Sequence, residues 1–183
     1  NQRLETNQLE KDIIAKKTAE MIEPNDTIML NSGTTTLLAF RNFPAEYNLS
    51  IVTNSIAVAL EAASNPNFNI ILLGGLINSK YQFTFGDDAN RQLKDYHADK
   101  LILSVDGIDV NSGFSTYYDK EAEIDRIMLR QANLAIVAAD FSKFNRRAFT
   151  KISDLSTADY IVTDTEVSAS VKAQFSKQSV TVY

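Results

Sequence analysis

The feature that most constrains the fold is an alternation of short apolar runs with segments whose apolar residues recur at helical spacing. Residues 27–30, 68–73 and 134–139 are examples of such runs, and helix-like segments lie between the runs along the chain. Strands that are apolar along their whole length are buried on both faces. Strands that alternate with helices form parallel βαβ units. The sequence therefore predicts an α/β domain with three layers, αβα, around a mostly parallel sheet.

The expected elements follow one another without a repeat or a low-complexity tract. We expect strands at residues 27–30, 49–52, 68–73, 100–105, 134–139, 160–162 and 179–182. We expect helices at residues 9–22, 34–40, 56–63, 87–96, 120–131 and 167–175. Residues 78–85 lack a clear period, and we predict a mobile loop there. The expected domain boundaries are 1–8 for a linker or helix start and 9–183 for one domain.

Composition excludes several classes of function. The formal net charge is −5, so an acidic chain of this kind is a poor partner for the phosphodiester backbone. The 183 residues include no Cys and a single histidine, His97, which excludes thiolate zinc sites and His-rich metal centres. His97 lies in a polar connection, and we predict it to be a surface residue rather than a catalytic base. No apolar stretch approaches the roughly 20 residues that a membrane span needs. We therefore expect no metal, no cofactor and no membrane partner, and the lack of Cys fits a cytoplasmic protein.

A loop of small and hydroxyl residues follows the first expected strand. Gly33 can take a positive φ and allows close approach to the backbone, while Ser32, Thr34 and Thr35 offer hydroxyl donors. The helix that follows presents unpaired N–H groups at its positive end. These groups would suit a phosphate monoester. The alternative is that one hydroxyl simply caps the helix.

Similar loops follow the other expected strands, and ligands of open α/β sheets bind at this edge. Asn54, after Thr53, could face a sugar hydroxyl, or the segment could cap the next helix. Lys143 could neutralise a phosphate, and Asp106 could bind hydroxyls or act in acid–base chemistry; both could equally be surface residues. Gly74 and Gly75 form a tight turn. No G-x-G-x-x-G or P-loop motif is present, which disfavours dinucleotide and nucleoside triphosphate cofactors.

A set of short motifs with regular spacing covers residues 9–182. In order, the motifs are Ile14-Ala-Lys-Lys-Thr-Ala-Glu-Met-Ile22, Asn31-Ser-Gly-Thr-Thr35, Val52-Thr-Asn-Ser55, Leu73-Gly-Gly75, Gly86, Asp106-Gly-Ile-Asp109, Asp119 with Glu121-Ala122, Ala139-Asp-Phe-Ser-Lys-Phe144 and Ile161-Val-Thr-Asp164. Together they resemble the C-terminal effector-sensing domain of DeoR-type bacterial transcriptional repressors. The family's fold is similar to that of ribose-5-phosphate isomerase and the CoA transferases.

The resemblance implies a receptor for a phosphorylated sugar that modulates DNA binding. The implied ligand-binding residues are Ser32, Gly33, Thr34, Thr35, Thr53, Asn54, Gly74, Gly75, Gly86, Asp106 and Lys143. Within that set, the phosphate would lie on the loop from Ser32 to Thr35. The resemblance also implies operator binding through an N-terminal winged helix-turn-helix outside this chain, and a homo-oligomer. The first loop position is often acidic in the family, and Asn31 makes it friendlier to phosphate.

Two other classes of function deserve comparison with a receptor. In the isomerases that the chain resembles, a lysine and a glutamate carry the chemistry, and their positions fall on Thr116 and Asp125 here. Loss of the lysine removes a cation that would stabilise an enediolate, and aspartate retracts the base by a methylene. We therefore expect no enzyme activity. An interaction module without a ligand would have arbitrary strand-end loops, and the repeated small polar loops argue against it.

Overall fold

A computed structural model describes residues 6–177 and 180–183. Within these ranges, a parallel seven-stranded sheet forms the centre of the molecule, in the order β12-β11-β9-β6-β1-β2-β3. Its strands are β1 (Thr27–Leu30), β2 (Leu49–Thr53), β3 (Phe68–Leu72), β6 (Ala98–Leu103), β9 (Ala132–Ala138), β11 (Tyr160–Val162) and β12 (Thr181–Val182). The predicted fold class, a three-layer α/β domain with a mostly parallel sheet, is confirmed.

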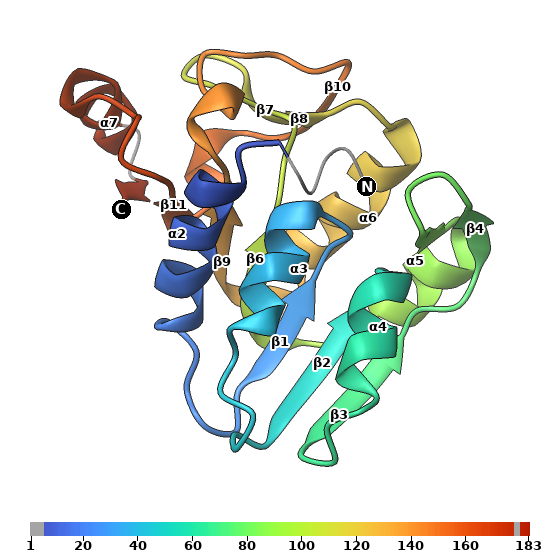
Figure 1. Ribbon diagram of the computed structural model, residues 1–183. Coiled ribbons are helices and arrows are strands. Elements are labelled where there is room, and N and C mark those ends of the chain that lie inside the picture. The colour runs from blue at the N-terminus through green and yellow to red at the C-terminus, as the bar shows by residue number, and fades with distance from the viewer. Residues whose placement is uncertain (1–5, 178–179) are drawn as a thin grey trace.

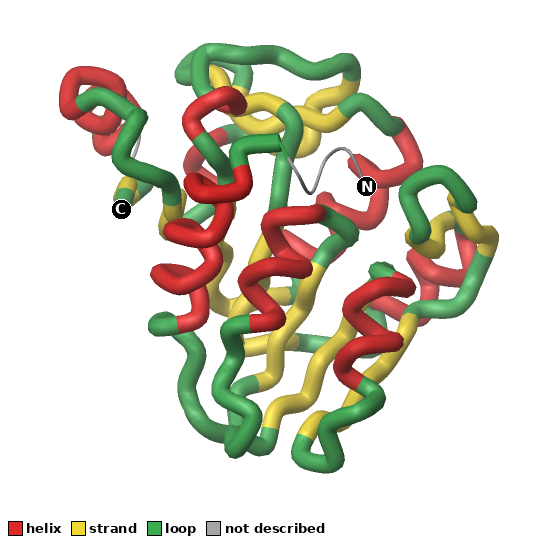
Figure 2. Tube along the Cα trace, in the orientation of Figure 1, coloured by secondary structure: helices red, strands yellow, loops and turns green. Residues whose placement is uncertain are grey.

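Helices cover both faces of the sheet (Figures 1 and 2). The helices are α2 (Gln8–Ala19), α3 (Thr34–Arg41), α4 (Ile56–Ala62), α5 (Asp87–Leu93), α6 (Asp119–Arg130) and α7 (Ala169–Ser176), with short 3-10 turns η1 (Phe141–Lys143) and η2 (Leu155–Thr157). In Figure 1, α2, α3 and α4 lie in front of the sheet, and α5 and α6 lie behind it. The strands point upward in that view, so their carboxyl ends meet at the upper edge.

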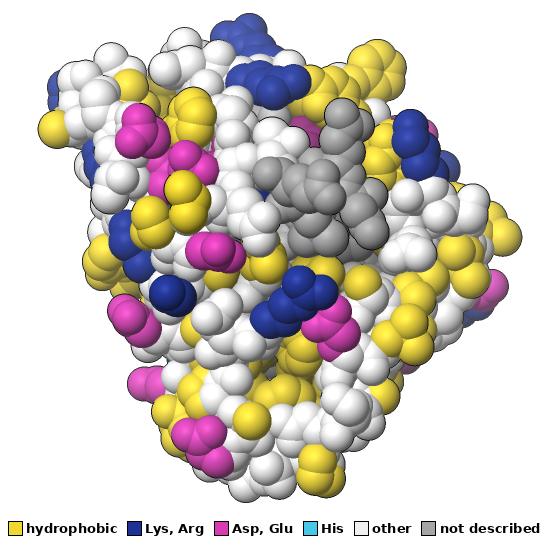
Figure 3. All heavy atoms as spheres, viewed as in Figure 1, with side chains coloured by type: hydrophobic (Ala, Val, Ile, Leu, Met, Phe, Trp, Pro, Cys, Tyr) yellow, Lys and Arg dark blue, Asp and Glu magenta, His cyan; other side chains and the backbone are white. Residues whose placement is uncertain are grey.

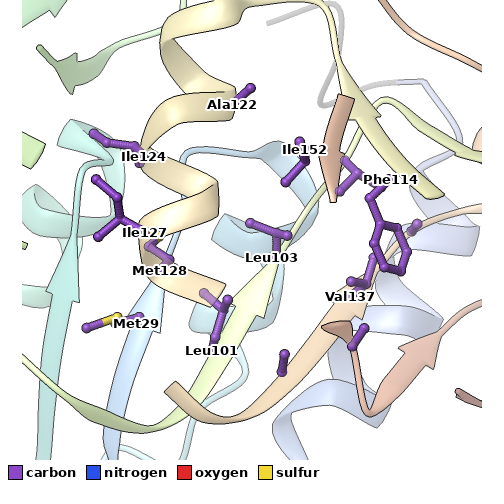
Figure 4. Close-up of a cluster of buried hydrophobic side chains, with 14 of the residues drawn as sticks. Met29, Leu101, Leu103, Phe114, Ala122, Ile124, Ile127, Met128, Val137 and Ile152 are labelled. Carbon is purple, nitrogen blue, oxygen red and sulfur yellow. The ribbon is translucent and has the colours of Figure 1, made fainter. Parts of the chain in front are cut away.

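The apolar strands build two separate cores because successive side chains point to opposite faces. Ile28 and Leu30 belong to the core under α2, α3 and α4, whereas Met29 between them belongs to the core under α5 and α6. Ile102 and Leu103 divide in the same way on β6. Figure 4 shows the second core, where strand side chains meet the apolar face of α6. Burial on both faces explains why these strands are continuous apolar runs rather than alternations.

The strand order creates a switch point between β1 and β6. From β1 the chain proceeds through β2 to the β3 edge, and from β6 it proceeds through β9 and β11 to the opposite edge. The loops after β1 and β6 therefore leave the sheet in opposite directions and leave a crevice between them. Ligands of open α/β sheets bind in crevices of this kind.

Two smaller sheets depart from the sequence-based expectation. Residues 78–85, predicted as a mobile loop, contribute to a hairpin of β4 (Leu76–Asn78) and β5 (Phe83–Phe85), so that prediction is wrong. An antiparallel sheet of β7 (Gly107–Asp109), β8 (Gly113–Thr116) and β10 (Thr150–Ser153) was not predicted. It lies above the carboxyl ends of the main strands in Figure 1. The three strands are short and mostly polar in sequence, so they lack a strand period.

Most element ends agree with the prediction within a few residues. The first helix ends at Ala19 rather than residue 22, and the last strand is confined to Thr181–Val182. Ser179, placed by prediction in that strand, lies outside the described residues. The boundary predicted between residues 8 and 9 falls at the first turn of α2, which begins at Gln8.

The turn between β7 and β8 gives a test of the small sheet. Gly113 has φ +79°, and a Cβ there would lie 2.0 Å from the carbonyl oxygen of Ser153. Gly113→Ala therefore has to displace β10 and adopt a strained backbone, which we expect to cost about 3 kcal/mol or more of unfolding free energy. Urea denaturation measures this loss. Asn111→Ala, an exposed position in the same turn, is the matched control and should change stability by less than about 0.5 kcal/mol; equal effects would contradict the steric argument.

Candidate functional site

One buried side chain, Asn31, joins the carboxyl ends of β1 and β6. Its Nδ2 donates to the carbonyl oxygen of Ser104 at 2.9 Å, and its Oδ1 accepts from the Ser104 N–H at 2.9 Å. The side-chain amide thus extends the hydrogen bonding of the two strands past their last residues. We predicted that Asn31 would make the loop friendlier to phosphate. That stays a prediction, and the structure shows a further role, because Asn31 is fully buried and its amide is directed at β6.

Gly33 is required for close packing at this point. A Cβ on Gly33 would lie 1.6 Å from Ser104 Oγ and 2.8 Å from Ser104 Cβ. The predicted positive φ is wrong, since Gly33 has an extended backbone with φ −151°. The predicted close approach is present, with Ser104 as the neighbour. The loop after β1 therefore lies directly against the loop after β6.

A cavity of about 240 Å³ opens at this junction. Its lining residues come from α2 and the chain before it, from α3, and from the loops after β6 and β9: Thr6, Asn7, Lys11, Thr34, Thr35, Ser104, Val105, Asp140, Ser142 and Lys143. Thr34, Thr35 and Lys143 are members of the predicted ligand-binding set. The structure thus brings together the predicted hydroxyl loop and the predicted lysine from distant parts of the chain.

The N-terminus of α3 faces the cavity without a side-chain cap. Gly33 is its N-cap residue and makes no side-chain hydrogen bond. Thr36 Oγ1 donates to the carbonyl oxygens of Asn31 and Gly33, at 3.1 and 3.0 Å, and so does not cap the helix. The alternative in which a hydroxyl caps this helix is therefore wrong. An uncapped first turn presents N–H donors and the positive end of the helix dipole, a setting suited to an anion.

The loop after β2 has a structural role instead. Ser55 caps α4, since its Oγ accepts from the Val58 N–H at 3.3 Å. Thr53 Oγ1 donates to the Leu30 carbonyl at 2.8 Å, and Asn54 Nδ2 donates to the Thr84 carbonyl at 3.3 Å. Thr53 and Asn54 are fully buried and do not line the cavity. The helix-cap alternative is confirmed for this loop.

Lys143 is brought to the cavity by the short turn η1. Asp140 precedes this turn and caps it, because its Oδ1 accepts from the N–H of Ser142 at 3.0 Å and from the Ser142 hydroxyl at 2.5 Å. Asp140 is almost completely buried, whereas Lys143 is half-buried. The position of the Lys143 backbone is therefore fixed by β9 and by the capped turn that follows it.

The predicted glycines lie away from the cavity lining. Gly75 and Gly86 have φ values of +141° and +98° and flank the β4–β5 hairpin. The Gly74 N–H donates to Gln92 Oε1 at 3.0 Å. Positive φ is the reason for glycine at positions 75 and 86. His97 is exposed, as predicted, with Nε2 2.7 Å from Asn133 Oδ1.

Three carboxyl groups gather behind the cavity around Thr116. The Thr116 hydroxyl lies 2.6 Å from Glu121 Oε2 and 3.1 Å from Asp106 Oδ2, and Asn31 Nδ2 donates to Asp125 Oδ1 at 3.2 Å. Burial, together with the nearby charge of Glu121, raises the pKa of Asp125 well above its usual range. A neutral Asp125 relieves the repulsion in this cluster. Asp106, predicted to face a sugar, is held by Thr116 and by the Tyr117 N–H at 3.2 Å.

Several cavity residues were missed from the sequence. Ser104 was placed inside the expected strand 100–105, whereas β6 ends at Leu103 and Ser104 begins the loop that follows it. Ser142 belongs to the motif that carries Lys143. Thr6, Asn7 and Lys11 carried no signal, because they reach the cavity only when α2 packs beside α3.

Comparison with known proteins identifies the family. The model of the DeoR C-terminal sensor domain matches residues 6–165. The chain belongs to this family. The chain is 35% identical over 87% of its length to an Escherichia coli O157:H7 protein assigned as an aga operon transcriptional repressor, covering 59% of that protein. It is 30% identical to the HTH-type transcriptional repressor GlcR of Bacillus subtilis, covering 88% of this chain and 62% of the repressor. The chain thus spans about three fifths of the length of these curated relatives.

Solved structures with the same fold include an isomerase and a subunit of eIF2B. Ribose 5-phosphate isomerase A of Methanocaldococcus jannaschii superposes with a TM-score of 0.55 at 17% identity, over 76% of this chain and 55% of the isomerase. The eIF2B delta subunit of Chaetomium thermophilum gives 0.65 at 14% identity, over 89% of this chain and 58% of that subunit. At such identities the likeness shows the fold alone. The named relatives of this DeoR-type sensor domain are transcriptional regulators or repressors.

The surface of the sensor domain carries mixed charges. On the face shown in Figure 3, Lys and Arg side chains are interspersed with Asp and Glu. Salt bridges such as Arg41 with Glu61 at 2.7 Å pair some of these charges. Of the described helices, none has the length and apolar character to span a bilayer.

Asp125 should make the stability of the sensor domain depend on pH. Its folded-state pKa is raised, so its contribution to stability is complete below the unfolded value of 3.8 and is lost as pH rises toward the folded pKa. Asp125→Asn keeps an acceptor for Asn31 and removes this loss. We expect the variant to be more stable than wild type at pH 8, with the gain shrinking toward pH 4. Urea denaturation across this range measures the gain, and a gain independent of pH would contradict the assignment.

Asn31 should be sensitive even to an isosteric change. Asn31→Asp replaces the donor to Ser104 and Asp125 with a carboxylate among acceptors, which we expect to cost about 3 kcal/mol of unfolding free energy. In an Asp125→Asn background the cost should be smaller, because the new amide at position 125 can donate to the new carboxylate. Denaturation of the two single variants and the double variant gives the coupling. Additive effects would show that the two side chains do not interact.

Proposed function

We propose that this domain binds a phosphorylated sugar and thereby modulates DNA binding by its regulator. The observation that carries the proposal is the cavity at the β1–β6 switch point. The lining of that cavity includes Thr34 and Thr35 at the uncapped N-terminus of α3, and Lys11 and Lys143 from two other elements. Backbone N–H groups at a helix start together with lysines are a common phosphate-binding arrangement.

The polar lining of the cavity supports a sugar as the rest of the ligand. Ser104, Ser142 and Asp140 lie at the loops opposite α3, where they can accept from or donate to ring hydroxyls. The cavity volume of about 240 Å³ is at the scale of a small metabolite rather than a dinucleotide. We therefore favour a sugar monophosphate over a larger cofactor.

The relatives support the part of the proposal that concerns DNA binding. They are named HTH-type regulators or repressors, and this chain spans about three fifths of their length. We infer that operator binding resides in a helix-turn-helix domain N-terminal to the sensor domain. A homo-oligomer would match the two-fold symmetry that such operators commonly have. The effector would then act by changing the affinity of that assembly for DNA.

Thermal unfolding with a panel of sugar phosphates tests the ligand class. Phosphorylated sugars should raise the melting temperature, and the matching sugars without phosphate should not, because the phosphate supplies the charge that the lysines and the α3 N-terminus bind. Equal shifts from both forms would contradict the proposal.

Variants at the cavity sharpen this test. Lys143→Met should weaken binding of the most stabilising sugar phosphate more than tenfold, about 1.4 kcal/mol. Thr34→Val should remove a charge-assisted hydrogen bond and cost about 1.5–3 kcal/mol of binding free energy. Isothermal titration measures both. Lys172→Met, on α7 and outside the cavity lining, is the matched control and should bind as wild type.

A further inference from the structure

The β3 edge of the main sheet differs from the opposite edge. β3 spans Phe68–Leu72, and among the described strands it pairs with β2 alone. The opposite edge strand, β12, is confined to Thr181–Val182, and a very short edge strand is one way in which proteins avoid unwanted strand pairing. Charged side chains and proline are other ways, and β3 contains neither. Its edge is therefore suited to pairing with a further strand.

Hydrogen bonds hold β3 in place at both ends. At its start, the Phe68 N–H donates to the Asn65 carbonyl at 3.1 Å, and Asn65 Nδ2 donates to the Ala45 carbonyl at 3.0 Å. Just after its end, the Gly74 N–H donates to Gln92 Oε1 at 3.0 Å. The strand is thus ordered within a single copy of the chain, and such preorganisation lowers the entropic cost of association.

The backbone groups of two β3 residues face the open edge. The Leu73 N–H donates to the Thr53 carbonyl at 2.9 Å, so the backbone of Leu73 faces β2. The N–H and C=O groups of successive strand residues point alternately to the two sides. Ile70 and Leu72 therefore direct their backbone groups away from β2. A further strand at this edge would bond to these groups.

Exposed apolar side chains lie on β3 and on the elements next to it. α4 packs beside β3, and β4 follows β3 in the chain. Figure 3, in the orientation of Figure 1, shows hydrophobic side chains gathered over α4 and β4. Apolar patches on a protein surface mark sites of interaction. The exposed residues are Leu60 (71%), Leu72 (41%), Leu76 (66%) and Ile77 (60%).

The absence of charge indicates which partner this edge fits. Residues 62–79 contain no charged side chain, although the chain has a formal net charge of −5. A two-fold axis sets a surface against itself, so a charge near the axis would face an identical charge. Recognition of a different protein places no such restriction on charge. The uncharged edge is therefore suited to a second copy of this acidic chain.

We propose that β3 pairs antiparallel with β3 of a second copy, so that two central sheets become continuous across a two-fold axis. Pairing through both outward-facing residues sets Ile70 of each copy opposite Leu72 of the other, and such pairs exchange both N–H···O bonds. The inference deepens the homo-oligomer of the proposed function by naming its interface. It does not depend on the ligand, because β3 does not line the cavity.

Sedimentation equilibrium of this chain and its charged variants tests the interface. Leu72→Lys places a charge at the β3 edge, and Leu72→Glu places the opposite charge there. In the proposed register the two copies of position 72 lie diagonally across the axis, within reach of long side chains. Leu9→Lys, on α2 and 77% exposed, is the matched control. Melting temperatures establish that each variant is folded.

We expect wild type to form dimers and Leu9→Lys to dimerise equally well. Leu72→Lys and Leu72→Glu should each raise the dimer dissociation constant at least tenfold, because like charges then meet at the axis. An equimolar mixture of these two variants should recover dimers, because opposite charges meet there instead.

Three results would each overturn the inference: a monomeric wild type, association that Leu72→Lys leaves intact, or a mixture of the two charged variants that stays monomeric. The proposed sugar-phosphate ligand would stand in each case. A dimer with the expected responses that binds no sugar phosphate would overturn the proposed ligand and support the β3 interface.

Discussion

The Asn31 side-chain amide is the contact on which the site depends. β1 and β6 are neighbours from which the chain departs in opposite directions, so nothing in the connectivity holds their ends together. The paired hydrogen bonds between Asn31 and the Ser104 backbone close that gap. They set Gly33 so close to Ser104 that no Cβ could be accommodated. The start of α3 is thereby fixed against the loop after β6, and residues of both segments line the cavity.

The same amide separates a polar cavity from an acidic interior. Asn31 Nδ2 also donates to Asp125, which lies with Asp106 and Glu121 around the Thr116 hydroxyl. A carboxyl cluster open to the cavity would repel an anionic ligand. Here the Thr116 hydroxyl and the Asn31 amide bind these acids, and burial raises the pKa of Asp125, which favours its neutral form. The cavity itself is lined by the start of α3, by two lysines and by one carboxyl group, Asp140, whose Oδ1 accepts hydrogen bonds from Asn7 and Ser142.

The main sheet could be predicted from sequence because burial on both faces leaves an unmistakable apolar run, as in Thr27–Leu30. That Thr34, Thr35 and Lys143 lie close together could be predicted, because the strand ends of a parallel sheet share one edge. The β7–β8–β10 sheet could not, since its short strands have no period. The sequence could not show that Asn54 is buried away from the cavity, because an amide with a structural role and an amide that binds a ligand have the same sequence signal. The place of Lys11 in the cavity lining could not be predicted either, because it depends on how α2 packs beside α3, and local sequence patterns do not encode that packing.

The acidic cluster also bears on the proposal that a domain with the fold of an isomerase acts as a receptor. We expected the loss of chemistry to follow from a base shortened by one methylene at Asp125. The structure gives a stronger reason, because Asp125 is completely buried and its Oδ1 accepts from Asn31 rather than facing the cavity. A carboxyl in that position cannot reach a proton on a bound sugar, whatever its length. Thr116 likewise commits its hydroxyl to Asp106 and Glu121 and presents no cation. Under the proposed function, the cavity at the strand ends would hold the ligand, and neither Thr116 nor Asp125 directs a base or a cation at it.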